Sequence, residues 1–122
     1  MKEAFGKKVW IFPDAELPPP GTSELKGHES LIILNMNKGP VSIHLKLYFT
    51  DTDPVELPTL SIDAERVMCI RMDNEHEVGF KISTETQYAI VVEADKPVVA
   101  QYGRLDSRQS NLAFYTTMGF SA

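Results

Sequence analysis

The stretch Val41-Ser-Ile-His-Leu-Lys-Leu-Tyr-Phe49 decides the fold class of this chain. Five apolar side chains, at every second position from Val41 to Phe49, alternate with Ser, His, Lys and Tyr. A period of two is that of a β-strand with one buried face and one wet face, because successive side chains point to opposite sides. The stretch is therefore predicted to be a strand.

A second apolar segment lies directly before this strand. Ser30–Met36 is rich in Leu and Ile, and Asn35–Pro40 supplies Asn, Gly and Pro. Asn and Gly are typical of turns between paired strands, and Pro is tolerated at the start of a strand. We expect the two segments to form a hairpin, with Pro40 marking the entry to the second strand.

Short apolar runs separated by turn residues recur along the rest of the chain. We expect further strands at Lys8–Phe12, Leu57–Ile62, Val67–Met72, Tyr88–Glu93, Val98–Leu105 and Leu112–Phe120, with breaks at Asp51–Pro54, Asp73–Glu75 and Ala94–Pro97. Pro13–Gly27 is interpreted as a surface loop and Glu75–Gln87 as a connection with a weak strand. The pattern predicts an all-β protein, an antiparallel β-sandwich of about seven to eight strands.

Length and composition favour one ordinary globular domain. The chain has 122 residues, of which 43% are hydrophobic and 24% charged, so we expect a single domain over residues 1–122. The net charge of −5, from 17 acidic and 12 basic residues, argues against a nucleic-acid partner. We expect a cytoplasmic protein, because the sequence lacks a signal-peptide pattern and an apolar run long enough to span a membrane.

The chain has one cysteine and three histidines, and their spacing does not match a metal site, so we expect no metal and no cofactor. Cys69 has no partner for an internal disulfide, which fits a reducing compartment, and we expect it to be an inert thiol in the core. There is no nucleophile-elbow context around Ser107 and no glycine-rich loop before a helix, so the sequence offers no catalytic residues. Binding is predicted in place of catalysis.

The segment Arg104-Leu-Asp-Ser-Arg-Gln109 is the most unusual part of the chain. It places two cations, a carboxylate, a hydroxyl and an amide at the end of an apolar strand. Arg can donate paired hydrogen bonds to a carboxylate or phosphate, and Asp can accept bonds from sugar hydroxyls. The alternative is a structural corner, in which Asp106 accepts from turn N–H groups and pairs with Arg104 or Arg108.

Three further residues are candidates, each with a structural alternative. His28 and Glu29 could act as acid and base, but adjacent strand residues point to opposite faces, and a hydrogen-bonded structural His is the more frequent case. Trp10, the only tryptophan, is either a stacking platform for a sugar or a core residue.

Several of these segments occur in the same order in the sensory rhodopsin transducer family, which the chain therefore resembles. The resemblance rests on Trp10, on the Pro-containing loop ending in Gly21, on His28-Glu29 followed by Leu31–Asn35, on Leu47–Asp51 with Pro54-Val55, and on Val98–Gln109. The Arg-Leu-Asp-Ser-Arg-Gln motif is its most specific part.

The resemblance implies a β-sandwich that assembles as a homotetramer, catalyses no reaction and binds no metal. It also implies two roles: transducing a signal from a membrane photoreceptor, or binding a small molecule such as a sugar. The ligand-binding positions it implies are Trp10, His28, Glu29, Arg104, Asp106, Ser107 and Arg108. If a ligand binds, these residues should converge on one concave site. If the protein is a protein–protein adaptor, it should show an exposed acidic or apolar patch and no pocket shared by these residues.

Overall fold

The computed structural model describes residues 5–108 and 112–122. Every strand pair in this part of the chain is antiparallel, so the prediction of an all-β antiparallel sandwich is confirmed. The elements in chain order are β1 (Lys7–Glu16), β2 (His28–Asn35), β3 (Val41–Phe49), β4 (Val55–Glu56), β5 (Leu60–Ile62), β6 (Arg66–Arg71), α1 (Glu75–Val78), β7 (Gln87–Asp106), β8 (Ala113–Thr117) and β9 (Phe120–Ser121).

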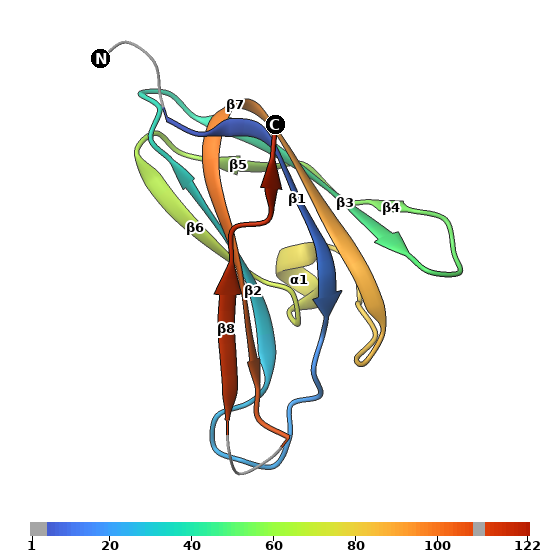
Figure 1. The fold of residues 1–122 in the computed structure, drawn as a ribbon. Helices are drawn as coiled ribbons and strands as arrows, with labels where there is room; N and C mark the ends of the chain where they lie inside the picture. The colour runs from blue at the N-terminus through green and yellow to red at the C-terminus, as the bar shows by residue number, and fades with distance from the viewer. Residues whose placement is uncertain (1–4, 109–111) are drawn as a thin grey trace.

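The strands form two layers that share one long strand (Figure 1). The first half of β7 pairs with β1 and β3, and that sheet is extended by β9 beside β1 and by β4 and β5 beside β3. The second half of β7 pairs with β2 and β8, and β6 completes this second sheet beside β2. We call them sheet A and sheet B.

The core lies between the two sheets and is built from alternating residues of their long strands. On β3 the buried positions are every second residue from Val41 to Leu47, and on β2 Leu31 and Ile33 have no exposed surface. Burial of one such side chain contributes roughly 1.5–3 kcal/mol. The sequence pattern that predicted the β3 strand is therefore also the pattern that fills the core.

The predicted β3 strand is confirmed at both ends and begins directly after Pro40, but the predicted hairpin with Ser30–Met36 is wrong. The preceding strand, β2, pairs with β6 and β7 in the other sheet. Asn35, at the start of the turn that crosses between the sheets, is buried, and its Nδ2 holds the turn by donating to the carbonyls of Gly39 at 3.1 Å and Ile62 at 3.1 Å.

The predicted break at Ala94–Pro97 is also wrong, since β7 is continuous from Gln87 to Asp106. These residues carry the chain from sheet A to sheet B, and polar groups of neighbouring strands hold them. The N–H of Ser42 donates to the Asp95 carboxylate at 2.9 Å, and Asn37 donates to the Pro97 carbonyl at 2.9 Å. Pro97 is accommodated because it falls at a register shift and has no partner residue in the pairing of β7 with β1, β2 or β3, so its missing N–H interrupts no ladder bond.

Other boundaries differ locally. Of the predicted Leu57–Ile62 strand only Leu60–Ile62 is a strand, β5, and a further short strand, β4, precedes the predicted one; the predicted Leu112–Phe120 strand is divided into β8 and β9. The weak strand expected in Glu75–Gln87 is wrong, because the segment begins with helix α1, whose first N–H groups donate to the side chain of Asn74. No helix in residues 5–108 and 112–122 is long and apolar enough to cross a membrane.

Cys69 is exposed, so the prediction of a core thiol is wrong. On β6 the alternation places Ile70 in the core, and the side chains on either side of it point outward. Because nearly every residue of Val67–Met72 is apolar, composition alone could not indicate which of them face inward.

Candidate functional site

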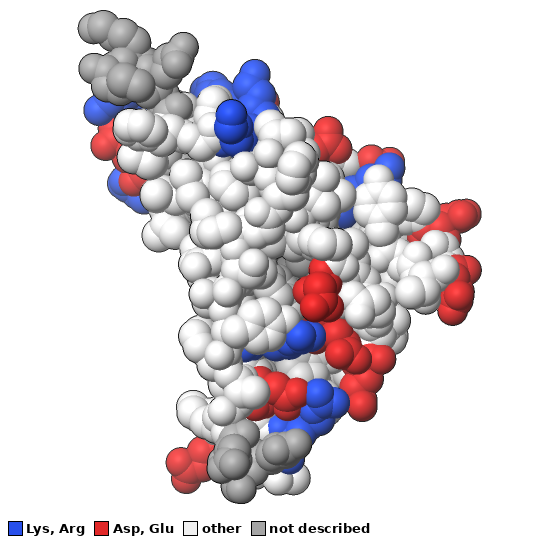
Figure 2. All heavy atoms as spheres, in the orientation of Figure 1, with Lys and Arg blue, Asp and Glu red and all other residues white. Residues whose placement is uncertain are grey.

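A small pocket at one end of the sandwich brings together part of the predicted site. We call it the charged pocket; it has a volume of about 160 Å³ and is lined by Glu16, Pro18, Arg104, Asp106, Arg108, Ala113 and Tyr115. On the face shown in Figure 2, acidic and basic atoms are interleaved near the lower ends of β1 and β8. The pocket therefore presents both signs of charge over a short distance.

Arg104 is held from two sides at the base of the charged pocket. Its Nη1 donates to the Glu16 carbonyl at 3.0 Å and lies 3.9 Å from the Glu16 carboxylate, and its side chain is 18% exposed. The guanidinium carbon lies 4.9 Å from the centre of the Tyr115 ring, the distance of a cation–π contact. Arg104 and Tyr115 are also directly paired residues of β7 and β8, so the register of the strands fixes this contact.

Asp106 and Arg108 form a pair at the rim of the same pocket. The Arg108 backbone N–H and Nε each donate to Asp106 Oδ1 at 3.0 Å, and Arg108 Nη2 also contacts the carboxylate. These hydrogen bonds from the Arg108 side chain and backbone hold the pKa of Asp106 below its ordinary value. Arg108 Nη1 also lies 3.4 Å from the Glu85 carboxylate. The pair thus makes the contacts of a structural corner while both side chains line the pocket.

Glu29 lies behind the pocket, in the core, with no exposed surface. Its carboxylate accepts hydrogen bonds from the Tyr88 hydroxyl at 2.6 Å, from the Tyr102 hydroxyl and from the Glu16 backbone N–H at 2.9 Å. Desolvation raises the pKa of Glu29, although the hydrogen bonds from Tyr88 and from the Glu16 N–H and the nearby charge of Arg104 oppose the shift. Glu29 therefore fixes the backbone of a pocket residue and does not itself line the pocket.

A second, apolar pocket is lined by Tyr115 as well. It has a volume of about 540 Å³ and is lined by Phe12, Pro13, Asp14, Tyr115, Thr117, Gly119 and Phe120. Because the Tyr115 ring borders both spaces, a ligand could place a polar end on the charged pocket and an apolar part along β8.

The three remaining predicted residues lie outside the charged pocket. Trp10 is 6% exposed, and its Nε1 donates to the Val98 carbonyl at 2.9 Å. His28 is half-buried, and its Nδ1 lies 2.9 Å from the Lys26 carbonyl. Ser107 is buried and donates to the Pro20 carbonyl at 3.1 Å. The last residue of the predicted motif, Gln109, lies outside the described residues.

Sequence reasoning missed Glu16 and Tyr115, which complete the charged pocket. Glu16 falls at the end of β1, within a stretch interpreted as a surface loop, and Tyr115 is one aromatic residue among several near the C-terminus. Only the pairing of β8 with β7 places Tyr115 over Arg104. No local signal in the sequence distinguishes these two residues.

Comparison with known proteins identifies relatives of this chain. The family model described as Anabaena sensory rhodopsin transducer matches residues 5–121. Among solved structures, Thermotoga maritima 1070 is similar over 98% of this chain and 97% of its own, with 29% identity and a TM-score of 0.87. The Anabaena sensory rhodopsin transducer is similar over 88% of this chain and 95% of its own, with 28% identity and a TM-score of 0.74. No curated protein matches the chain.

The family match spans nearly the whole chain. Both solved structures have the same fold, and their sequences are 29% and 28% identical to this chain, so the likeness extends beyond the fold. The resemblance drawn from the sequence motifs is thereby confirmed. This chain belongs to the sensory rhodopsin transducer family.

Proposed function

We propose that this protein is a non-enzymatic signalling module of the cytoplasm that binds a small hydroxylated molecule, such as a sugar, in the charged pocket. The observation that supports the proposal is the convergence of Arg104, Asp106 and Arg108 on one concavity beside the Tyr115 ring. These residues come from the most specific motif of the chain, and elements far apart in the sequence complete the pocket.

The chemistry of the lining fits a neutral ligand with several hydroxyl groups. Carboxylate oxygens of Glu16 and Asp106 accept hydrogen bonds, and the guanidinium of Arg108 donates them. The charges offset one another, because Arg108 contacts Asp106 and Arg104 lies 3.9 Å from the Glu16 carboxylate. The Tyr115 ring, 38% exposed, offers an apolar face on which a sugar ring can stack.

A second candidate function is that of a protein–protein adaptor that docks on the cytoplasmic face of a membrane photoreceptor. It is favoured by large apolar side chains exposed at the C-terminal end of the chain, since such patches mark protein interfaces. The exposed fractions are 44% for Leu112, 69% for Phe114, 45% for Met118 and 62% for Phe120. In the homotetramer that we propose for this family member, other copies of the chain would cover part of this surface.

The test is a thermal-shift titration of the full chain with mono- and oligosaccharides, with Arg108→Ala as the variant. At ten times Kd a ligand stabilises the native state by about 1.4 kcal/mol, which raises the Tm of a chain of this size by about 5 °C. The matched control is Arg66→Ala, because Arg66 is an exposed arginine on β6 whose side chain, among the residues that the structure describes, donates only to the carbonyls of Ala64 and Glu65.

A dose-dependent shift that Arg108→Ala abolishes and Arg66→Ala retains is the expected result. A shift that survives Arg108→Ala places the ligand elsewhere and overturns the proposed site. No shift with any saccharide favours the adaptor function and leaves the Arg104–Arg108 segment as a structural corner.

A further inference from the structure

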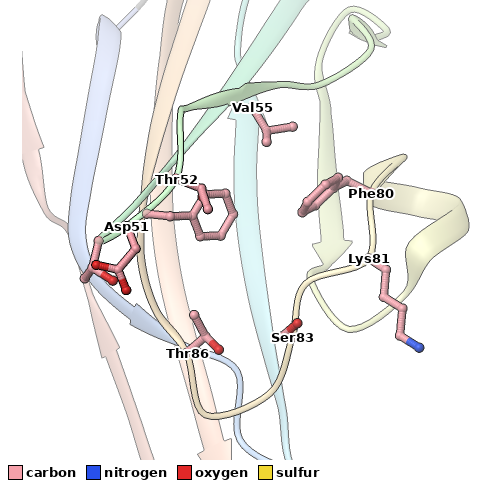
Figure 3. A pocket seen from close by; sticks show the side chains of 9 residues that line it. Asp51, Thr52, Val55, Phe80, Lys81, Ser83 and Thr86 are labelled. Atoms are coloured by element: carbon pink, nitrogen blue, oxygen red, sulfur yellow. The ribbon is translucent and has the colours of Figure 1, made fainter.

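A separate cleft opens between the turn after β3 and the segment that precedes β7 (Figure 3). It has a volume of about 290 Å³, close to the lower limit of about 300 Å³ for small-molecule sites. Its lining is Phe49, Thr50, Asp51, Thr52, Val55, Phe80, Lys81, Ser83 and Thr86, and none of these residues lines the charged pocket. We call it the aromatic cleft; its volume suits a ligand with a single ring.

The walls of the aromatic cleft are two phenylalanine rings. The ring centroids of Phe49 and Phe80 are 6.1 Å apart with an interplanar angle of 46°, and both residues are half-buried. Figure 3 shows the Phe80 ring directed across the cleft toward the β3–β4 turn, with Val55 above it in this view. Aromatic faces that remain accessible in a concavity favour an apolar or cationic guest.

The Phe49 wall is anchored in the core and so is preformed. The ring stacks on Tyr88, with centroids 6.2 Å apart and an interplanar angle of 27°. Tyr88 is 1% exposed, and its hydroxyl donates to the buried Glu29 carboxylate. A wall that is ordered before binding spares a ligand part of the entropic cost of association.

Apart from Lys81, the polar side chains that line the cleft are negative or neutral. The Asp51 carboxylate lies at one end, and Ser83 and Thr86 contribute hydroxyls at the side opposite Val55 (Figure 3). Within residues 5–108 and 112–122, the Asp51 carboxylate makes no hydrogen bond to a side chain and no ion pair. The amino group of Lys81, by contrast, points away from the space between the rings.

The surroundings of the cleft are acidic too. The segment Phe49–Leu57 carries Asp51, Asp53 and Glu56 and no Lys or Arg. The opposite segment, Phe80–Thr86, carries Lys81 and Glu85, and Glu85 is paired with Arg108, so the negative charge comes from the Phe49–Leu57 side. A negative rim raises the local concentration of cations and disfavours anions. Charge complementarity therefore selects the class of guest.

We propose that the aromatic cleft binds a small organic cation, in which one apolar ring lies against Phe49 and Phe80 and an ammonium group faces Asp51. The hydroxyls of Ser83 and Thr86 accept further hydrogen bonds from the ammonium group or from a polar substituent. The site is independent of the charged pocket and adds a second ligand class to the function proposed above.

Three probes of one shape test the proposal: benzylamine, benzyl alcohol and benzoate, titrated into the full chain and followed by amide chemical shifts in two-dimensional NMR. Benzylamine should bind about three- to tenfold more tightly than benzyl alcohol, the range of a partly exposed ion pair with a cation–π contribution. Benzoate should bind more weakly than either probe. The shifted amides should include those of Phe49, Phe80 and Ser83.

Variants separate the charge from the aromatic wall. Asp51→Asn should remove the preference for benzylamine over benzyl alcohol, and Phe80→Ala should weaken the binding of both probes. Asp53→Asn is the matched control, because Asp53 lies in the same turn but does not line the cleft. Arg104→Ala removes a charged-pocket side chain that contacts Glu16 and Tyr115, neither of which lines the cleft, and should leave all three titrations unchanged, so this proposal and the charged-pocket proposal can fail separately.

Equal affinity for benzylamine and benzyl alcohol would overturn the proposal, as would equal losses in Asp51→Asn and Asp53→Asn. Shifts confined to amides outside residues 49–55 and 80–86 would also place the cation elsewhere and overturn it.

Discussion

Removal of the buried carboxylate of Glu29 should expose how strongly it joins the two sheets. Its oxygens accept from Tyr88 and Glu16 in sheet A and from Tyr102 in sheet B, and Glu29 itself belongs to β2 of sheet B. In Glu29→Ala all three buried donors lose their acceptor, at about 1–3 kcal/mol each. Relaxation offsets part of this loss, and we expect a destabilisation of about 4 kcal/mol, a large share of the stability of an ordinary domain.

Glu29→Gln should be far milder, at about 1 kcal/mol. The amide oxygen can take the position of Oε2 and accept from Glu16 and Tyr102, and the amide nitrogen can donate to a Tyr88 hydroxyl that has turned around. Urea denaturation at neutral pH, with equal m-values as the check on two-state behaviour, measures both variants. A loss below about 1 kcal/mol in Glu29→Ala, or an equal loss in the two variants, would refute the assignment of Glu29 as the inter-sheet acceptor.

The pH dependence of the free energy of unfolding tests the role of Glu29 independently. Because burial raises the pKa of Glu29, the folded state binds more protons than the unfolded state at pH values above the ordinary pKa of 4.5. The contribution of Glu29 to stability is therefore full below that value and is lost as the pH rises through the raised pKa. Glu29→Gln should lack this decline, whereas Glu93→Gln, a change at an exposed glutamate of β7, should retain it. A decline of the same size in Glu29→Gln and the native chain would show that another group causes it.

Two further substitutions test the packing around the sites. Trp10→Phe removes an indole whose Nε1 donates to the Val98 carbonyl, so the free energy of unfolding, measured by urea denaturation, should fall by about 1–3 kcal/mol. Saccharide binding should not change. A loss of binding without a loss of stability would show that Trp10 belongs to the binding site. Gly119→Ala should cost at least about 2 kcal/mol, since Gly119 has φ of +67° and a Cβ there would lie 2.5 Å from the Ile11 carbonyl oxygen; a stability within about 0.5 kcal/mol of the native chain would contradict that geometry.

The local alternation of apolar and polar residues predicted the fold class but not which strands pair with one another. In Val41–Phe49 every second residue is apolar and the others are polar, so the strand and its buried face were both predictable. In Val67–Met72 nearly all residues are apolar, and the outward direction of Cys69 depends on which side of β6 meets the core. The hairpin prediction failed because Asn35 makes hydrogen bonds to distant carbonyls that turn residues alone do not reveal.

The candidate site was predictable only where its residues are close together in the chain. Arg104, Asp106 and Arg108 stand out as a cluster of charges after an apolar strand, and they do line one pocket. Glu16 and Tyr115 reach that pocket through the pairing of distant strands, which no local pattern encodes. Trp10 was a candidate because it is unique, but uniqueness does not distinguish a stacking surface from a buried indole with a carbonyl partner.

The continuity of β7 also has a consequence for biosynthesis. β1, β2 and β3 leave the ribosome before β7, yet all three use β7 as a neighbour, so neither sheet can be completed until Gln87–Asp106 has emerged. Until then the nascent chain carries apolar strands with open edges, the kind of species that associates wrongly at high concentration. From this one shared strand we expect slow folding, which is typical of β-proteins rich in contacts between distant segments.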